Sequence, residues 1–164
     1  MNQQTSRQYL MSLVIIFGAL LFAQVLFIGL VYFLFTNENS TPDPATDSLF
    51  QMIVPIVAVV NVGLSFFVPK RIIQAMQSKD NQSLMTKLGA FRTALLIRCA
   101  FLESVSLFGS ISYVLTGNLL FLGIAGLMVI LFTTFVPTSQ RVADELQLSY
   151  QEKAILEDPN GVIG

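Results

Sequence analysis

The first third of the chain contains a long run of residues without a charge. It extends from Tyr9 to Phe35, is 27 residues long, and is interrupted only by Ser12, two glycines and Gln24. About 20 residues are enough for a helix to cross the hydrocarbon core of a bilayer. A secretory signal peptide has a shorter apolar region, about 7 to 15 residues, and a small-residue cleavage site after it. We therefore expect this run to be a membrane span that stays attached.

Three further apolar segments follow the first. They run from Leu49 to Val68, from Ala94 to Leu115 and from Leu119 to Val136, which precedes Pro137. Because little chain separates them, and because a helix satisfies its own backbone hydrogen bonds in lipid, all four segments are predicted to be helices. The sequence thus predicts an all-α fold, an integral membrane four-helix bundle of two hairpins over residues 1–137, followed by a tail over residues 138–164.

The composition excludes several classes of function. The chain has 54% apolar and 12% charged residues, no histidine and one cysteine, Cys99. Zinc, haem and non-haem iron sites commonly use the side chains that are missing, so we expect no metal and no cofactor. The net charge of -1 gives no basic face for nucleic acid. No glycine-rich phosphate loop and no nucleophile beside a base is present, so we expect no enzymatic activity.

The basic residues fall on one side of the expected spans. Arg7 precedes the first span and Arg98 lies near the start of the third. The others lie between the second and third spans or in the tail: Lys70, Arg71, Lys79, Lys87, Arg92, Arg141 and Lys153. The connections 36–47 and 116–118, expected on the opposite side, have none. Because lysine and arginine favour the cytoplasmic side, both termini are predicted to be cytoplasmic in a multi-pass protein of the inner (plasma) membrane.

The cytoplasmic segments also carry local signals. Ser78 to Gln82 is the expected turn between the second and third spans. In the tail, Thr138 or Ser139 can cap one short helix, and Ser149 with Glu152 forms a capping box for another. We expect the apolar residues of these helices to lie on the membrane surface or on a partner protein, and the acidic bias of the tail favours the partner. They are Val142, Leu146, Leu148, Ile155 and Leu156.

Polar residues inside the spans are the candidate functional residues. Glu103 lies roughly 14 Å inside the third span, and Asn61 lies about 12 Å inside the second, so the two are expected at similar depths. Gln24 is expected nearer the level of Ser110 and Tyr113. One polar stripe of the third span is expected to face protein. It consists of Cys99, Glu103, Ser106, Ser110 and Tyr113.

The two charged residues of the third span need different explanations. Arg98 is about 140 degrees from Glu103 around the helix, so the two are not neighbours, and Arg98 is expected to snorkel to the headgroups. Three interpretations of Glu103 stay open. In the first, Glu103 is a neutral acid, favoured by desolvation, that forms a hydrogen bond with Asn61 or a carbonyl and holds the bundle together. In the second, it is a proton or cation site. In the third, it pairs with a basic residue of another chain.

Phe108 and Gly109 follow Glu103 at five and six residues. This arrangement resembles the ion-carrying helix of rotary ATPase proteolipid subunits, and the resemblance implies that Glu103 is an ion carrier. In that family the inner helix is rich in glycine and the termini lie outside. Here Val54 to Phe67 contains only Gly63, and both termini are expected inside.

The chain as a whole resembles an uncharacterised group of small four-span proteins from bacteria, through Arg92, the Glu103 helix, the turn 116–118 and the tail motif Leu146-x-Leu148-Ser149. The resemblance implies a bacterial plasma membrane. We therefore expect a non-enzymatic accessory or assembly subunit of a larger membrane complex, with membrane lipids and other membrane subunits or further copies as its partners. The alternative is a proton or cation channel, or a proteolipid-like oligomer, that uses Glu103, with Asn61 and Gln24 as polar lining.

Overall fold

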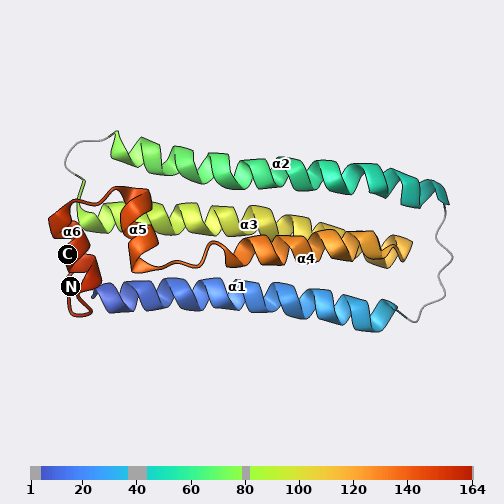
Figure 1. Ribbon diagram of the computed structural model, residues 1–164, viewed down its shortest axis with the longest axis horizontal. Helices are drawn as coiled ribbons and strands as arrows, with labels where there is room; N and C mark the ends of the chain where they lie inside the picture. Colours follow the sequence, from blue (N-terminus) through green and yellow to red (C-terminus); the bar gives the residue numbers. More distant parts are fainter. Residues whose placement is uncertain (1–4, 37–43, 79–81, 164) are drawn as a thin grey trace.

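The computed structural model describes residues 5–36, 44–78 and 82–163, and this part of the chain is all-α. Four helices lie side by side along the long axis, with two short helices at one end (Figure 1). They are α1 (Ser6–Phe35), α2 (Pro44–Gln77), α3 (Leu84–Thr116), α4 (Leu119–Thr133), α5 (Ser139–Leu146) and α6 (Tyr150–Glu157). We call the end that holds both termini and α5 and α6 the terminal end, and the opposite end the loop end.

Three of the four long-axis helices are long and apolar enough to cross a membrane. α1, α2 and α3 have 30, 34 and 33 residues. The expected turn after α2 falls largely on residues 79–81, which lie outside the described residues.

The fourth helix is shorter than the sequence suggested. The segment 119–136 was expected to be helical throughout, but α4 ends at Thr133 and has 15 residues. At about 1.5 Å per residue its length is about 22 Å, less than a hydrocarbon core of about 30 Å. The backbone tightens in its last turn, where Thr134 and Phe135 donate to carbonyls three residues back. Pro137 then disfavours a helical conformation at Val136.

α3 is the central helix of the bundle and contacts α1, α2 and α4. Half of its most apolar 18-residue window is buried, compared with 17% in α1 and 22% in α2. The outward faces of α1 and α2 instead carry large exposed apolar side chains, such as Phe33 and Val59 at 79% and 73% exposure. Continuous exposed apolar surface of this kind is typical of helices that face lipid or another protein.

α3 and α4 approach each other closely at Gly109. A Cβ atom at this position would lie 2.9 Å from the Phe121 carbonyl oxygen, closer than side chains pack. Gly117 joins the two helices in the left-handed conformation, with φ 67°, which costs glycine no steric strain. Glycine at both places therefore keeps this hairpin tight.

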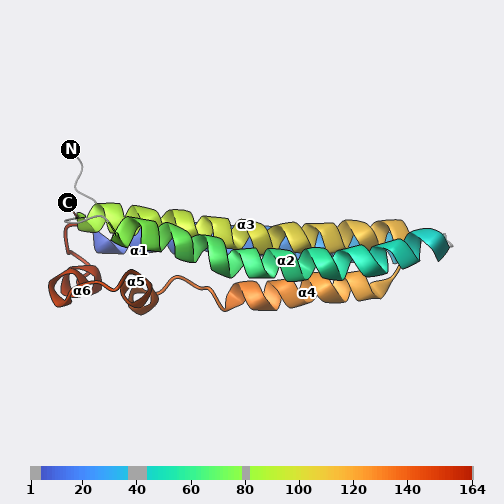
Figure 2. The ribbon, with the colours of Figure 1, turned by 90° about the horizontal axis from the view of Figure 1, so that it is seen from above.

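The tail forms the two short helices that its capping residues predicted. The Thr138 side chain accepts a hydrogen bond from the Arg141 amide, and Ser149 and Glu152 form a reciprocal capping box. In a view turned by 90°, α4, α5 and α6 follow one another along one side of the molecule (Figure 2). Both caps confirm the sequence prediction for these helices.

The tail packs on its own bundle. Val142, Leu146 and Leu156 are buried in the same apolar cluster as residues of α1 and α3. The Ser6 hydroxyl donates to the Ile155 carbonyl at 2.7 Å and its amide donates to the Gly161 carbonyl at 2.9 Å. The expectation that these three apolar side chains lie on a membrane surface or a separate partner is therefore wrong, because the chain itself covers them.

Candidate functional site

Arg98 of α3 joins several segments at the terminal end. Its Nη1 atom lies 3.1 Å from Oε1 of Glu145 in α5, and its Nε atom donates to the Ser65 carbonyl of α2 at 3.3 Å. The guanidinium also stacks over the Phe135 ring, 4.7 Å from its centre. Only 8% of Arg98 is exposed. The expectation that Arg98 extends to the headgroups is therefore wrong, because the tail supplies a carboxylate.

The Ser65 carbonyl needs a donor from outside its helix. Pro69 lies inside α2 and has no backbone N–H, so the carbonyl four residues before it loses its helical hydrogen bond. A carbonyl left without a donor in the interior costs free energy. Arg98 supplies the missing donor, and this explains how α2 stays helical through Pro69 to Gln77.

Glu103 has a less enclosed position than the polar stripe implied. Its side chain is half-buried, at the edge of the α3 face that meets the other helices. Among the described residues, none donates a hydrogen bond or forms an ion pair with its carboxylate. Asn61, the expected partner, donates to the Val57 carbonyl of its own helix and accepts from Ser104 at 3.3 Å. Asn61 thus meets the residue next to Glu103, because Ser104 faces α2.

Gln24 is the most isolated polar side chain in the described core. It is 1% exposed, and neither its Oε1 nor its Nε2 atom has a hydrogen-bond partner within the described residues. Buried amides without partners are rare, because desolvation costs them free energy that nothing restores.

The depth of Gln24 follows from two hydrogen bonds between α1 and α3. They are Tyr9 Oη to the Leu88 carbonyl at 2.7 Å, and Thr36 Oγ1 with Tyr113 Oη at 3.2 Å. These two contacts place Gln24 in the middle of the bundle, between the two ends of α3. The expectation that it lies nearer the level of Ser110 and Tyr113 than that of Glu103 stays a prediction.

The remaining residues of the stripe are buried and have partners. Ser106 donates to the Ala125 carbonyl of α4 at 3.4 Å, and Ser110 donates to the Ser106 carbonyl at 2.8 Å. Tyr113 meets Thr36, as noted above. Cys99 is buried as well. This part of the stripe faces protein, and the hydroxyl groups of Ser106 and Tyr113 join α3 to α4 and to the end of α1.

A second ion pair ties α6 to the start of α3. Lys87 Nζ lies 2.6 Å from Oε1 of Glu152. Partial burial alone raises the pKa of the Glu152 carboxyl, but hydrogen bonds from Lys87 and Ser149 favour the charged form more strongly, so this pKa lies below its usual value. The Glu152 side chain that caps α6 therefore also holds this helix against the start of α3.

Sequence reasoning missed the contact between Arg98 and Glu145. Glu145 lies 47 residues after Arg98, in a helix whose position depends on the connection 134–138. Pro69 was the one available signal, because a proline inside a long helix indicates a carbonyl that needs an external donor.

The described residues contain no group of three or more histidine, cysteine, aspartate or glutamate side chains placed to hold a metal ion. No protein-family model, curated protein or solved structure matches the chain. The two resemblances drawn from the sequence therefore stay predictions.

Proposed function

We propose that the chain is an integral membrane protein with four spans, the fourth being the segment 119–136. The length and apolar surface of α1, α2 and α3 support this placement. α4 packs along α3 and reaches the same loop end, and the residues after the turn at Thr134 and Phe135 carry the chain on toward the terminal end. A bilayer adapts to one short helix by local thinning, at a modest cost.

The proposed orientation has the terminal end in the cytoplasm. Both ends of the described chain, the end of α2 and the start of α3 lie there (Figure 1). Apart from Arg98, which is buried, the basic residues of the described segments are on the helix ends and tail helices of that end: Arg7, Lys70, Arg71, Lys87, Arg92, Arg141 and Lys153. Lysine and arginine near span ends favour the cytoplasmic side. A bacterial plasma membrane is the setting that the resemblance to four-span proteins implies.

Within this membrane, we propose a non-enzymatic role as an accessory or assembly subunit of a larger complex. The observation that carries this proposal is the half-buried Glu103, which has no partner in the described chain. An intramembrane carboxylate is costly unless it is paired or neutralised. A donor from another membrane subunit, or from a second copy, would reduce that cost. Glu103 is accessible to such a donor because it lies at the edge of the bundle.

A second candidate function is proton or cation translocation through Glu103. One observation favours it specifically: Gln24, in the middle of α1, is buried and has no partner among the described residues. An amide and a carboxyl inside one bundle are groups that can share a proton or coordinate a cation. Asn61 is less suited to this role, because its side-chain amide already forms hydrogen bonds with Val57 and Ser104.

One experiment separates the two functions. The protein is reconstituted in vesicles, and proton and sodium flux are compared for the wild type, Glu103→Gln and the control Asp144→Asn, which removes an exposed charge from α5. Flux that only Glu103→Gln abolishes would reject the accessory role. Reaction with a hydrophobic carbodiimide, slowed by the transported ion, gives an earlier indication.

The subunit role has its own positive test. A photoreactive amino acid at Leu107, one turn from Glu103, is expected to crosslink to a membrane protein of defined mass in native membranes, and the same group at Val59 on the outer face of α2 is the control. The crosslink should disappear in Glu103→Gln. Absence of flux together with this loss supports the subunit, whereas identical crosslinks at both sites reject it.

A further inference from the structure

One side of α3 is left uncovered by the rest of the described chain. α3 and α4 lie between α1 and α2 (Figure 1), and Figure 2 shows α3 and α4 on opposite sides of the molecule. Ala100, Ser104 and Ile111 of α3 are exposed. They fall within about 40 degrees of one another around the helix, away from the side that meets α4. We call these three residues, with Glu103 and Leu107 at their edge, the α3 face.

Glu103 needs a partner that is itself inside the membrane. Its carboxylate has no hydrogen-bond or ion-pair partner among the described residues. Glu103 comes 13 residues before Thr116, the last residue of α3, and therefore lies about 20 Å from the loop end. That depth is well within a hydrocarbon core of about 30 Å. Because polar chain at this depth has to be helical, a protein group that reaches Glu103 there is carried by another helix.

Neutral donors are already present beside the carboxylate. The Ser104 hydroxyl is shared between the Phe101 carbonyl, at 2.8 Å, and Oδ1 of Asn61, at 3.3 Å. The Asn61 amide donates to the Val57 carbonyl. These groups satisfy one another and leave Glu103 without a donor. Hydrogen bonds between charged groups are about twice as strong as neutral ones. Charge complementarity therefore favours a lysine or arginine as the missing partner of Glu103.

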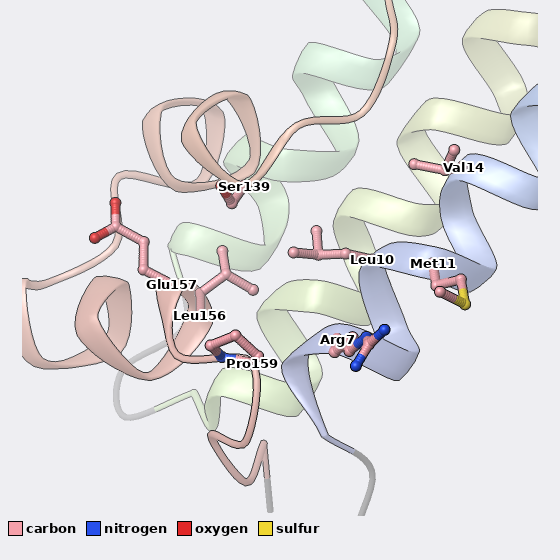
Figure 3. A pocket seen from close by; sticks show the side chains of 8 residues that line it. All are labelled: Arg7, Leu10, Met11, Val14, Ser139, Leu156, Glu157 and Pro159. Carbon is pink, nitrogen blue, oxygen red and sulfur yellow. The ribbon is translucent and has the colours of Figure 1, made fainter.

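A second copy of the chain does not supply this charge. In the same membrane orientation, the basic residues of its described segments lie at the terminal end, apart from Arg98. Arg7, for example, lines a cavity of about 540 Å³ between the first turns of α1 and the tail (Figure 3). Arg98 is nearer to Glu103, but only 8% of it is exposed. Its guanidinium already contacts Glu145 and the Ser65 carbonyl.

We propose that the α3 face binds one transmembrane helix of another subunit, and that this helix carries a lysine or arginine in the middle of its span. The basic side chain pairs with Glu103, and the helix lies along Ala100, Ser104 and Ile111. Small side chains at the first two of these positions let helices approach closely. The inference rests on the subunit role proposed above and adds the chemistry of the partner.

A designed helix of about 20 leucines with uncharged polar ends, long enough to cross a bilayer, serves as the probe. Four versions carry lysine, asparagine, glutamate or leucine at the central position. The full chain, with a photoreactive amino acid at Ile111, is reconstituted with each peptide in phosphatidylcholine vesicles. The same photoreactive group at Val59, on the outer face of α2, is the matched control. The yield of crosslinked peptide measures binding at each place.

At Ile111, the lysine peptide is expected to crosslink roughly fivefold more than the leucine or asparagine peptide, the ratio that a partly exposed ion pair gives. Glu103→Gln should remove this preference. Glu103→Lys should reverse it in favour of the glutamate peptide, which a loss of folding would not do. At Val59 the four peptides should crosslink equally. The comparison of the four peptides in the otherwise unchanged chain does not depend on the folding of any Glu103 variant.

Several results would overturn the partner. Equal crosslinking of all four peptides at Ile111 would reject a basic partner, and a crosslink at Leu107 in native membranes would then show that the subunit role survives. Equal yields for the asparagine and lysine peptides would show that a neutral donor is enough. Crosslinked dimers of the chain, formed without peptide and lost in Glu103→Gln, would identify a second copy instead. A lysine preference in vesicles without any Leu107 crosslink in native membranes would reject the subunit role itself.

Discussion

The terminal end and the middle of the bundle treat polar side chains in opposite ways. At the terminal end, Arg98 and Lys87 pair with glutamates of the tail helices, and Arg98 also serves a carbonyl that Pro69 leaves without a donor. In the middle of the bundle, Gln24 and Glu103 have no hydrogen-bond or ion-pair partner in the described chain.

The difference indicates that paired and unpaired polar side chains have different roles in this protein. Polar contacts at the terminal end hold three helices and the tail in one arrangement, which is a structural task. Polar groups without described partners in the middle raise the free energy of the isolated chain, and both proposed functions give these groups a partner from another subunit or an ion. The following predictions test this contrast, from the largest expected effect to the smallest.

Removing the carboxylate of Glu145 should have the largest effect. Glu145→Ala leaves the guanidinium of Arg98 buried without its counter-charge, and breaking such a pair costs about 3 kcal/mol. Thermal unfolding in detergent and protease cleavage of the tail measure the loss. Asp144→Ala, an exposed neighbour in α5, is the matched control. Equal effects of the two substitutions would show that the terminal end does not depend on this pair.

Packing rather than polar contact should dominate where α3 and α4 meet. Gly109→Ala places a Cβ atom 2.9 Å from the Phe121 carbonyl and is expected to cost about 1 to 3 kcal/mol by overpacking. Gly123→Ala is the control, because nothing lies within 4 Å of its added Cβ. That change should be neutral or stabilising by up to about 1 kcal/mol, since alanine favours helix. Similar melting temperatures for both variants would contradict the close approach.

Gln24→Leu should stabilise the isolated protein. It removes a buried amide that has no described partner, and such groups cost about 1 to 3 kcal/mol in proteins. The unfolding midpoint in detergent is expected to rise, while any flux through Glu103 should fall. A lower unfolding midpoint would contradict the contrast between the two regions, because it would mean that the Gln24 amide already has a partner, such as an internal water.

The ion pair of Glu152 should give a small pH dependence. Because the pKa of this carboxyl is lowered in the folded chain, its contribution to stability is present above 4.5, its ordinary value, and is lost as the pH falls below that value. The contribution is expected to be less than about 1 kcal/mol, because both side chains are partly exposed. Lys87→Met should weaken this part of the pH dependence of the melting temperature. An unchanged acid profile would contradict the anchoring of α6.

The sequence predicts the helices well because hydrophobicity and capping are local properties. The long apolar runs lie within α1, α2 and α3, which extend beyond them, and the caps at Thr138 and Ser149 locate α5 and α6. The end of α4 was missed by three residues. The apolar pattern continues to Val136, whereas the backbone is governed by the turn that precedes Pro137.

The candidate site was less predictable. The depth of a side chain in the bundle and the neighbour that it faces both depend on how adjacent helices are aligned along their axes. Helical spacing correctly put Ser106, Ser110 and Tyr113 on a buried face. It gave no offset between neighbouring helices, so Asn61 was assigned to Glu103 instead of Ser104. An error of one residue along a helix turns a side chain by about 100 degrees, which is enough to change its partner.

By itself the sequence determined that the chain forms apolar helices, where the two tail helices begin, and that basic residues gather near one end of the expected spans. These properties follow from composition and from interactions within a few residues. Only the tertiary structure decided that Arg98 meets Glu145, that the tail packs its own apolar residues against the bundle, and that the buried amide of Gln24 has no partner among the described residues. Each of these depends on the packing of segments far apart in the chain, because side-chain partners are fixed by helix register and not by local pattern.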